Sequence, residues 1–232
     1  VLKSYGVFVI TGAGLKEIKE GTAVYTKNGE EDTLDGDAIL LATGRGPNTE
    51  GLHAERAGVE LTKRGAVVTD KHLRTTAENI WAAGDVCGNL QFTYISLDDS
   101  RIILSDMQGD GSRTTENRGA FAYSVFMEPS FSRVGLSEKE AADKGLNYRV
   151  VRMNTDMIPK AKVLRKTTGM LKAVIDKDSG KIFGAALFCP ESYEIINMVK
   201  LAMDHDLDYT VLRDFIYTHP TMSEGLNDLF AL

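Results

Sequence analysis

Cysteine is scarce in this sequence: its 232 residues include two cysteines, alongside five prolines and one tryptophan. Cys87 and Cys189 lie far apart and form neither a Cys-x-x-Cys pair nor a metal-ligand spacing. The sequence therefore excludes a Cys-x-x-Cys redox motif within these residues, and we predict no metal site. We expect both cysteines to be buried thiols without chemistry of their own.

A basic surface and a long apolar run are also missing. The formal charge is −6 and the pI is about 5.3. Nucleic acids and anionic membranes bind basic surfaces, so we expect neither as a partner. No apolar run approaches the roughly 18 residues of a membrane span, and no signal-peptide pattern opens the chain. We predict a cytoplasmic protein, although a chain that starts at Val1 rather than Met carries little information on targeting.

A complete dinucleotide-binding fingerprint is the third absence. Gly12-Ala13-Gly14 resembles the start of one, but Glu17 takes the place of the third glycine and no helical apolar pattern follows. Residues 1–35 instead alternate as short strands, with Asn28-Gly29 as a strong hairpin signal. We interpret them as the last strands of a nucleotide-binding domain whose phosphate-binding turn lies upstream of this chain.

Two apolar runs that are present end in glycine-containing turns. Residues 37–42 lead into a turn at 43–48, and residues 79–83 lead into Gly84-Asp85. A buried strand that ends in Gly-Asp lets the backbone and one carboxylate approach a ligand, and open α/β sheets bind nucleotides at such strand ends. Gly-Asp alone more often marks an ordinary strand and turn. The combination of motifs favours a ligand site.

Helical spacing follows Asp85. Apolar residues recur up to Gly109 and predict a helix over residues 94–108. Its free N–H groups and positive dipole end would face a ligand held by Asp85. The alternative is a plain packing helix capped by Thr93. Between the two turns we expect one or two helical turns over residues 52–58 and a strand over residues 65–69.

The second half of the chain predicts an α+β domain. Residues 109–113 are small and polar and indicate a linker. Ser137-x-x-Glu140 is a capping box that opens a short helix ending at Gly145, and apolar residues from Ile195 to Met203 mark the inner face of a longer helix. Strands precede the long helix, as in α+β domains. The predicted strands span residues 123–126, 131–134, 149–153, 170–175 and 182–188.

His219 and Glu224 form a candidate site near the carboxyl terminus. One interpretation is structural: Thr221-x-x-Glu224 is a capping box and His219 a solvated loop residue. The other is chemical, because a carboxylate on one imidazole nitrogen fixes the tautomer and leaves the other nitrogen to transfer protons. The remaining histidines, His53, His72 and His205, are expected to have no such partner.

Three stretches together resemble the class I pyridine nucleotide-disulfide oxidoreductases, the flavoprotein family of dihydrolipoamide dehydrogenase, glutathione reductase and mercuric reductase. The stretches are residues 42–48, 79–85 and 218–224, and their order and spacing extend the resemblance over essentially all 232 residues. The resemblance implies that His219 and Glu224 act across a homodimer, as acid and base to a dithiol of the opposite subunit. That dithiol, spaced Cys-x4-Cys, lies outside this chain.

The same resemblance implies a set of cofactor-binding residues. In the family, the turn at 43–45 closes the NAD(P) domain, the Gly-Asp pair holds the ribityl chain of FAD, and the following helix points its start at the isoalloxazine edge. The residues at these positions are Thr43, Gly44, Arg45, Gly84, Asp85, Phe92 and Thr93.

One branch of the family resembles this chain most, the reactive chlorine resistance oxidoreductases. Residues 91–99 and 123–126 carry that resemblance. Glutathione reductases have a Thr-Pro pair where this chain has Thr93-Tyr94, so Tyr94 leaves the geometry of the flavin edge open. Mercuric reductase lacks the His-Pro pair and ends in extra cysteines, which lowers that option here.

The sequence thus predicts an α/β remnant of nucleotide-binding domains over residues 1–115, then an α+β dimerisation domain with an antiparallel sheet over residues 119–232. We expect the carboxyl-terminal part of an FAD-dependent NAD(P)H oxidoreductase that passes hydride to flavin and electrons through a dithiol to a disulfide or another small oxidant. The alternatives are a dimerisation module without chemistry and a metal-ion reductase. Without the dithiol, the chain alone is not expected to turn over, and neither the substrate nor the choice of NADH or NADPH follows from it.

Overall fold

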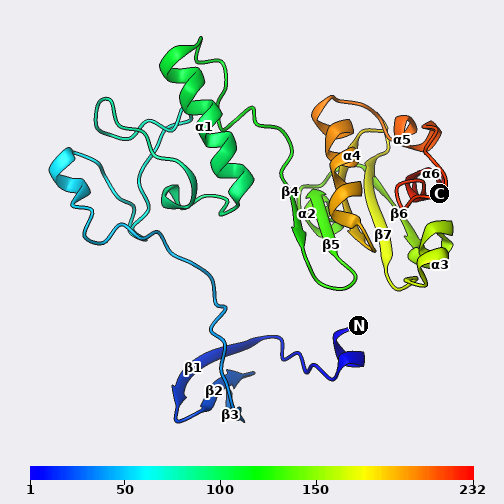
Figure 1. The fold of residues 1–232 in the computed structure, drawn as a ribbon, viewed down its shortest axis with the longest axis horizontal. Coiled ribbons are helices and arrows are strands. Elements are labelled where there is room, and N and C mark those ends of the chain that lie inside the picture. The colour runs from blue at the N-terminus through cyan, green and yellow to red at the C-terminus, as the bar shows by residue number, and fades with distance from the viewer.

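The computed structural model describes residues 1–232 and divides them among three regions (Figure 1). A small sheet lies at the amino terminus, an irregular lobe packs against one side of a long helix, and a second sheet covered by helices forms the carboxyl-terminal region. No helix in the structure is long and apolar enough to cross a membrane.

The first region is a three-stranded antiparallel meander, preceded by a 3₁₀ turn at Leu2–Tyr5. Its strands are β1 (Ala13–Lys19), β2 (Thr22–Lys27) and β3 (Glu30–Asp35), in the order β1-β2-β3. Asn28 and Gly29 join β2 to β3 with φ angles of 54° and 86°. Two consecutive positive φ angles define the tight hairpin turn that the Asn-Gly pair predicts, so that prediction is confirmed.

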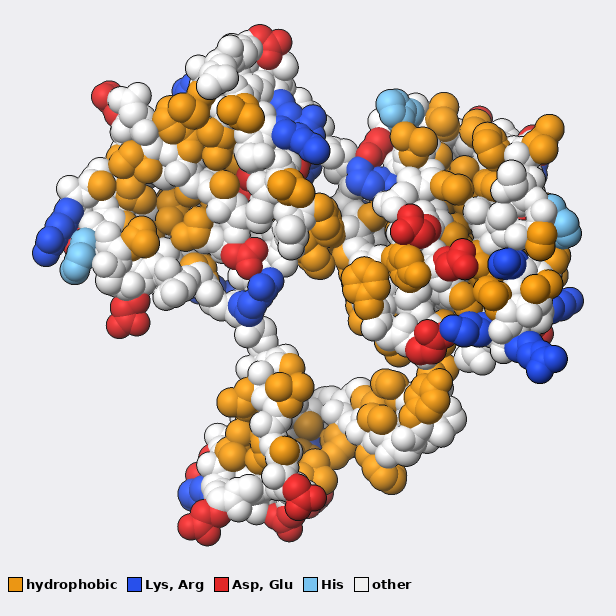
Figure 2. All heavy atoms as spheres, viewed as in Figure 1, with side chains coloured by type: hydrophobic (Ala, Val, Ile, Leu, Met, Phe, Trp, Pro, Cys, Tyr) orange, Lys and Arg blue, Asp and Glu red, His pale blue; other side chains and the backbone are white.

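The apolar runs around this sheet do not form the strands predicted for them. Residues 6–10 and 37–42 form no strand, and Leu40 is 88% exposed. Figure 2 shows hydrophobic side chains on the surface of this amino-terminal region. A buried parallel strand needs a hydrogen-bonded neighbour and covering helices on its faces. No element within residues 1–232 supplies these to either run, so the prediction of a buried strand at 37–42 is wrong for this structure.

The run that leads into Gly84-Asp85 is likewise not a strand. It makes one isolated bridge, from Trp81 to Arg74, and residues 84–87 form a 3₁₀ turn. The strand predicted at 65–69 is reduced to a single bridge between Leu61 and Val67. The helical turns predicted over 52–58 are confirmed by a 3₁₀ helix at Ala54–Ala57.

The long helix α1 (Thr93–Gln108) confirms the helix predicted over residues 94–108. Its buried face carries Ile95 and Ile102, and Ile102 packs with Leu73 and Cys87 in a small core. The helix therefore forms the packing centre of the lobe, against which the segment around Gly84-Asp85 is held.

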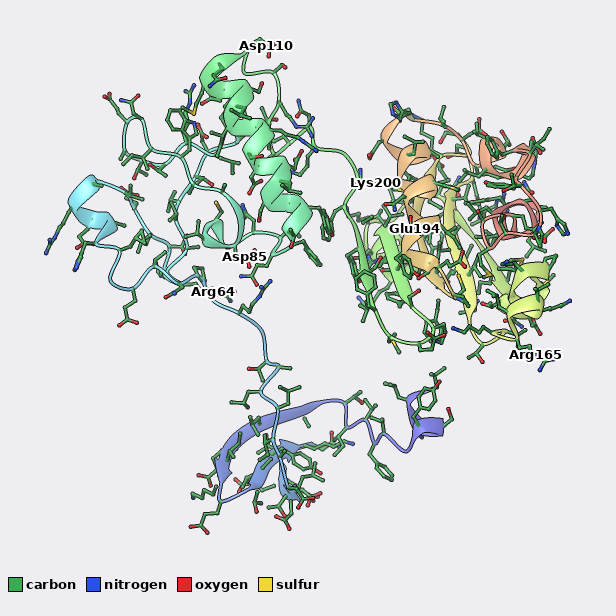
Figure 3. All side chains as sticks on the ribbon, viewed as in Figure 1. Arg64, Asp85, Asp110, Arg165, Glu194 and Lys200 are labelled. Carbon is green, nitrogen blue, oxygen red and sulfur yellow. The ribbon has the colours of Figure 1, made fainter.

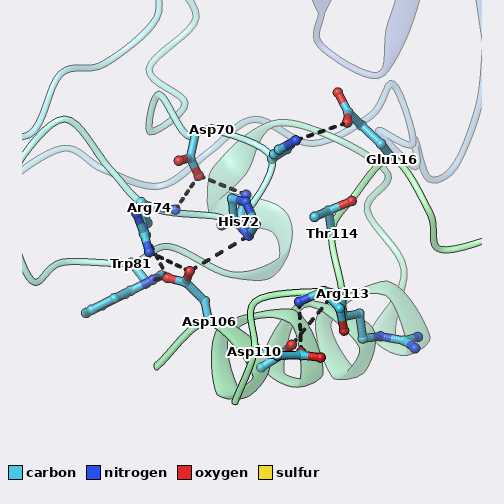
Figure 4. A network of polar contacts seen from close by, with 12 residues as sticks. Asp70, His72, Arg74, Trp81, Asp106, Asp110, Arg113, Thr114 and Glu116 are labelled. Carbon is cyan, nitrogen blue, oxygen red and sulfur yellow. Dashed lines mark hydrogen bonds and ion pairs between the residues drawn. The ribbon is translucent and has the colours of Figure 1, made fainter. Parts of the chain in front are cut away.

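A buried carboxylate near the end of α1 fixes the run before Gly84-Asp85 (Figure 4). Asp106 is 3% exposed at its side chain and accepts hydrogen bonds from Arg74 Nε at 2.7 Å, Arg74 Nη2 at 2.6 Å and Trp81 Nε1 at 2.8 Å. Asp70 accepts from the backbone N–H groups of His72 and Arg74, both at 2.9 Å. Residues 70–81 are thus tied to the helix by charge-assisted bonds, which are the stronger class of hydrogen bond.

The carboxyl-terminal region is a five-stranded antiparallel sheet in the order β4-β5-β8-β7-β6. One face of its inner strands, including Leu171 and its cross-strand partner Leu187, belongs to a core of 21 buried residues. The sheet and helices confirm the predicted fold class. The strands are β4 (Ala122–Val125), β5 (Phe131–Gly135), β6 (Tyr148–Asn154), β7 (Met170–Asp176) and β8 (Ile182–Phe188).

Helices cover that face at two places. The longest, α4, packs on β4, β5 and β8, whereas α6 packs on β6 and β7. The capping box predicted at Ser137 and Glu140 is confirmed, because both reciprocal hydrogen bonds are present. The helices are α2 (Glu138–Asp143), α3 (Pro159–Leu164), α4 (Ser192–Asp204), α5 (Thr210–Asp214) and α6 (Gly225–Ala231).

From the hydrogen bonds of Asp106 we predict that protonation of its carboxyl group at acid pH changes the fluorescence of Trp81, the only tryptophan. Hydrogen bonds from Arg74 hold the pKa of the Asp106 carboxyl below its ordinary value of 3.8. Its contribution to stability is therefore complete above the unfolded-state pKa and is lost as the pH falls through the lowered folded-state pKa. We expect Trp81 fluorescence to change in a step with its midpoint below pH 3.8.

Substitution Asp106→Asn should abolish that step, because the neutral amide has no proton to gain in this range. Asp110→Asn is the matched control, since Asp110 lies just beyond the same helix and bonds Ser112 rather than Trp81. A wild-type fluorescence step in Asp106→Asn would show that another group governs the transition.

Candidate functional site

The predicted site residues gather in two places. One lies around Asp85, near the amino end of α1 (Figure 3), and the other is the pair His219 and Glu224 just before α6.

Gly84 allows the turn that carries Asp85 to pack against α1. Its φ is +76°, and a Cβ added to it would lie 2.6 Å from the Ser96 hydroxyl oxygen, so a larger residue would clash with the helix. Its N–H group donates to Oδ2 of the buried Asp99 at 2.8 Å. The turn is thereby packed directly on the helix, and the Asp85 carboxylate is left partly exposed to a ligand.

Asp99 is a residue that the sequence argument did not single out. Its other oxygen, Oδ1, accepts from Arg118 Nη2 at 2.7 Å, and Asp98 beside it pairs with Arg113. A signal was present in the sequence, because two adjacent acidic residues interrupt the apolar face of a helix. Their partners are distant in sequence and could not be read from it.

Arg45 and Asp85 come from separate motifs and meet in the structure. Arg45 Nη2 lies 3.2 Å from Asp85 Oδ2 and donates to the carbonyl oxygen of Gln91 at 3.0 Å. The guanidinium therefore links the 43–48 turn to the segment that precedes α1. Thr43 and Gly44 are exposed, lie in a bend before Arg45 in which Gly44 has a φ of 110°, and make no hydrogen bond within the chain.

The amino end of α1 has unused backbone donors. Phe92 is the N-cap residue in an extended conformation, and no side chain caps the helix. Thr93 is instead the first helical residue, so the alternative of a Thr93 cap is wrong. The first N–H groups of a helix have no intrahelical acceptor and carry its positive dipole end. They can bind an acceptor or anionic group of a ligand near Asp85.

Tyr94 connects this helix end to the carboxyl-terminal region. Its hydroxyl donates to the carbonyl oxygen of Ala122 on β4, and its ring lies 5.4 Å from Phe92 and 6.1 Å from Phe121 between centroids. Burial raises the pKa of the Tyr94 hydroxyl. Tyr94, which departs from the Thr-Pro pattern, therefore connects the amino end of α1 to the five-stranded sheet.

A cavity of about 750 Å³ opens beside this contact. Phe92, Thr93 and Tyr94 line one side, and Glu194 and Lys200 of α4 lie across from them (Figure 3). Five of the twelve lining residues are aromatic and five are polar or charged, so the cavity offers both stacking surfaces and hydrogen-bonding groups to a small molecule.

At the second place, Glu224 makes the contacts that both interpretations of the sequence require. Its Oε2 lies 2.7 Å from His219 Nδ1, and its Oε1 accepts the Thr221 N–H at 3.2 Å. The Glu224 N–H in turn donates to the Thr221 hydroxyl at 3.4 Å. The carboxylate therefore closes a capping box with one oxygen and holds the imidazole with the other.

The exposure of the pair suits proton transfer. The His219 side chain is 69% exposed, whereas that of Glu224 is 16% exposed. Because Glu224 engages Nδ1, Nε2 of this largely exposed ring has no hydrogen bond and can exchange a proton with a group that approaches from outside.

The other histidines have no carboxylate bonded as Glu224 is to His219, although two of them lie near one. His53 Nδ1 lies 3.5 Å from Glu55, and His72 Nδ1 lies 3.8 Å from Asp106. Both separations exceed those of a good hydrogen bond, and neither nitrogen is bonded as His219 is. His205 has no ion pair.

Neither cysteine of this chain is available for thiol chemistry. Cys87 and Cys189 are both buried, as predicted, and burial raises their pKa values to about 11 and about 12. Such thiols stay protonated near neutral pH and are poor nucleophiles. No group of three or more His, Cys, Asp or Glu side chains is arranged to hold a metal ion.

The two places lie at opposite edges of the five-stranded sheet. The amino end of α1 contacts β4 through Tyr94, whereas α6 packs on β6 and β7 (Figure 1). With the order β4-β5-β8-β7-β6, the width of the sheet separates the strand that Tyr94 contacts from the strands on which α6 packs.

Family comparisons cover most of the chain. Residues 1–100 match the family described as pyridine nucleotide-disulphide oxidoreductase, and residues 121–230 match its dimerisation domain. The probable pyridine nucleotide-disulfide oxidoreductase RclA of Escherichia coli K12 is 48% identical over 100% of this chain and 53% of its own length. A mercuric reductase of Staphylococcus aureus is 34% identical over 97% of the chain and 42% of its own length.

Solved structures agree. The HOCl-induced flavoprotein disulfide reductase RclA of Escherichia coli has a TM-score of 0.91 and 47% identity, over 100% of this chain and 53% of that one. LpdA of Mycobacterium tuberculosis has a TM-score of 0.86 and 23% identity, over 99% of this chain and 50% of that one, which indicates a shared fold. The chain spans about half the length of the relatives it matches. Its sequence, its fold and these matches establish that the chain belongs to the pyridine nucleotide-disulfide oxidoreductase family.

Proposed function

We propose that this chain is the carboxyl-terminal part of an FAD-dependent NAD(P)H oxidoreductase that reduces a disulfide or another small oxidant. Residues 1–115 would contribute to the nucleotide-binding domains and residues 119–232 would form the dimerisation domain. The observation that carries the proposal is the 2.7 Å contact between His219 Nδ1 and Glu224 Oε2, which prepares an exposed imidazole for proton transfer.

The residues around Asp85 fit a flavin. The partly exposed carboxylate can accept hydrogen bonds from ribityl hydroxyls, Gly84 keeps the backbone close to α1, and the open N–H groups at Thr93 and Tyr94 suit an electron-rich ring edge. When bound, FAD would accept hydride from NAD(P)H and deliver electrons to a dithiol. Thr43, Gly44 and Arg45 would belong to the NAD(P) side of the site, and Arg45 orients Asp85.

His219 would manage protons for the dithiol. In its neutral form, its Nε2 takes the proton of a thiol, and in its protonated form it returns a proton to a leaving thiolate of the substrate. Glu224 fixes Nδ1 as the donor to its carboxylate and so leaves Nε2 for the exchange. Within this chain, both steps would need only His219 and Glu224.

A homodimer would bring the two places together. Asp85 and His219 lie at opposite edges of one sheet, so a His219 that serves the flavin site must come from a second copy. Phe215 and Ile216 beside His219 are exposed, Ile216 to 92%, which suits a protein contact. Support also comes from the match of residues 121–230 to a dimerisation domain. The acidic surface favours neither nucleic acid nor membrane, and we propose a cytoplasmic location.

A metal ion is the second candidate oxidant. One relative is named mercuric reductase, and one of the matching RclA structures is a Cu(II) complex, with a TM-score of 0.85 and 48% identity over 93% of this chain and 48% of that one. A metal ion can take electrons directly and does not need the proton that His219 would supply. A dimerisation module without chemistry remains the third candidate, and it would require no role for the His219–Glu224 pair.

We expect the 232-residue chain to be dimeric at micromolar concentration, because obligate interfaces of this type bury roughly 2,000 Å² or more. Light scattering measures the mass. Ile216→Glu should weaken the dimer by placing a charge in the interface, whereas Leu40→Glu, at an equally exposed apolar site outside the carboxyl-terminal region, should leave it intact. A monomeric wild-type chain would contradict the proposal.

In the full-length protein, His219→Gln should lower disulfide turnover by roughly 10² to 10⁴, because glutamine keeps the hydrogen bond but cannot transfer the proton. Flavin reduction by NAD(P)H, followed by stopped flow, should survive because it needs no proton from this pair. Glu224→Gln should cost less, and the two losses should not add because the residues act as one unit.

His205→Gln serves as the control, since His205 has no carboxylate partner and lies at the end of α4. If His219→Gln and Glu224→Gln lose disulfide turnover but reduce Cu(II) or Hg(II) near the wild-type rate, the two kinds of oxidant take electrons by separate routes. An unchanged disulfide rate in His219→Gln would end the proposed role of the dyad.

A further inference from the structure

The Thr221 hydroxyl lies inside the turn that presents His219. It donates to the carbonyl oxygen of Thr218 at 2.8 Å and accepts the Glu224 N–H at 3.4 Å. The Thr221 N–H donates to Glu224 Oε1 at 3.2 Å. One residue thus bonds the backbone before His219, the backbone of Glu224 and the carboxylate that holds the imidazole.

The His219 ring depends on this arrangement because little else supports it. The side chain is largely exposed, and its only hydrogen bond is to Glu224 Oε2. Pro220 follows His219 and has no N–H group to donate, so the short turn contains few backbone bonds. The position of the imidazole is therefore set by the Glu224 carboxylate and by the path of the backbone from 218 to 224.

The core holds the other end of the turn. Met222 is almost fully buried, and a Cβ added to Gly225 would lie 2.7 Å from Cδ1 of the buried Ile158. The Glu224 backbone is thus anchored on its inner side, whereas the Thr218 carbonyl reaches that anchor through the Thr221 hydroxyl. Loss of the hydroxyl would free the His219 side of the turn while the Glu224 side stays fixed.

We propose that Thr221 is a positioning residue, whose hydroxyl sets the distance between His219 Nδ1 and the Glu224 carboxylate. This role rests on the proposed function of the dyad for its catalytic consequence, but not for its geometric one. The side chain is also suited to the task, because β-branching restricts χ1 and keeps the hydroxyl directed at its acceptor.

The geometric consequence can be measured in the 232-residue chain without cofactors. Nitrogen NMR of the neutral imidazole distinguishes hydrogen on Nδ1 from hydrogen on Nε2, and four histidines make the spectrum assignable. Glu224 accepts from Nδ1 only when Nδ1 carries the hydrogen. Wild type should show His219 mainly as the Nδ1–H form, and Thr221→Val, which keeps the shape and removes the hydroxyl, should shift it toward the mixture of a free imidazole.

Two controls separate this effect from general damage. Thr221→Ser restores the hydroxyl and should restore the Nδ1–H form. Ser223→Ala removes a hydroxyl that makes no hydrogen bond in the same turn and should change nothing. If Thr221→Val does not fold by circular dichroism, Thr221→Ala replaces it in the same measurement. A wild-type tautomer in the folded variant lacking the hydroxyl would overturn the positioning role.

In the full-length protein, Thr221→Val should lower kcat for disulfide reduction about 2- to 10-fold, the size expected for one neutral hydrogen bond, with KM little changed. Thr221→Ser should recover it. A loss of kcat that Thr221→Ser fails to recover would overturn the assignment to the hydroxyl. If His219→Gln has no effect on turnover while the tautomer shift is observed, the proposed function fails and the positioning role stands.

Discussion

The position of helix α1 relative to the Gly84-Asp85 turn and to Arg118 depends on the buried Asp99 carboxylate. It accepts the Gly84 N–H with one oxygen and the Arg118 guanidinium with the other, so it ties the Gly-Asp turn, helix α1 and the connection to the second sheet into one unit. A carboxylate taken out of water is costly unless it is paired and hydrogen-bonded. Both of its oxygens are bonded here, and loss of either partner would leave a buried charge uncompensated. The hydrogen bond between Gly84 and Asp99 therefore sets the position of the neighbouring Asp85.

Local determinants explain which elements the sequence predicted. The helix at Thr93–Gln108, the hairpin at Asn28-Gly29 and the capping box at Ser137 depend on spacing or on residue type within a few positions. The runs at 37–42 and 79–83 were misassigned because a buried strand is defined by neighbours on both sides, and its own residues do not reveal whether those neighbours exist. The same pattern therefore gave an exposed extended segment at Leu40.

The candidate site shows the same division. The spacing of His219 and Glu224 was sufficient to suggest their pairing, because five residues across a tight turn bring the side chains within reach. The approach of Arg45 to Asp85 and the contact of Tyr94 with Ala122 join residues 40 and 28 positions apart, and only the packing of α1 brings these together. Sequence motifs could thus name most members of the site, while the contacts that arrange them depend on tertiary structure.

The two oxygens of the Glu224 carboxylate make different contacts, which affects how this position tolerates substitution. Active-site residues commonly reduce stability, so that their replacement stabilises a protein while it removes activity. Glu224 differs, because the oxygen that bonds the Thr221 N–H stabilises the turn before α6 while the other oxygen holds His219. Selection for folding and selection for chemistry would then act on it in the same direction. A variant library selected only for soluble expression should therefore retain glutamate at position 224, although activity is not selected.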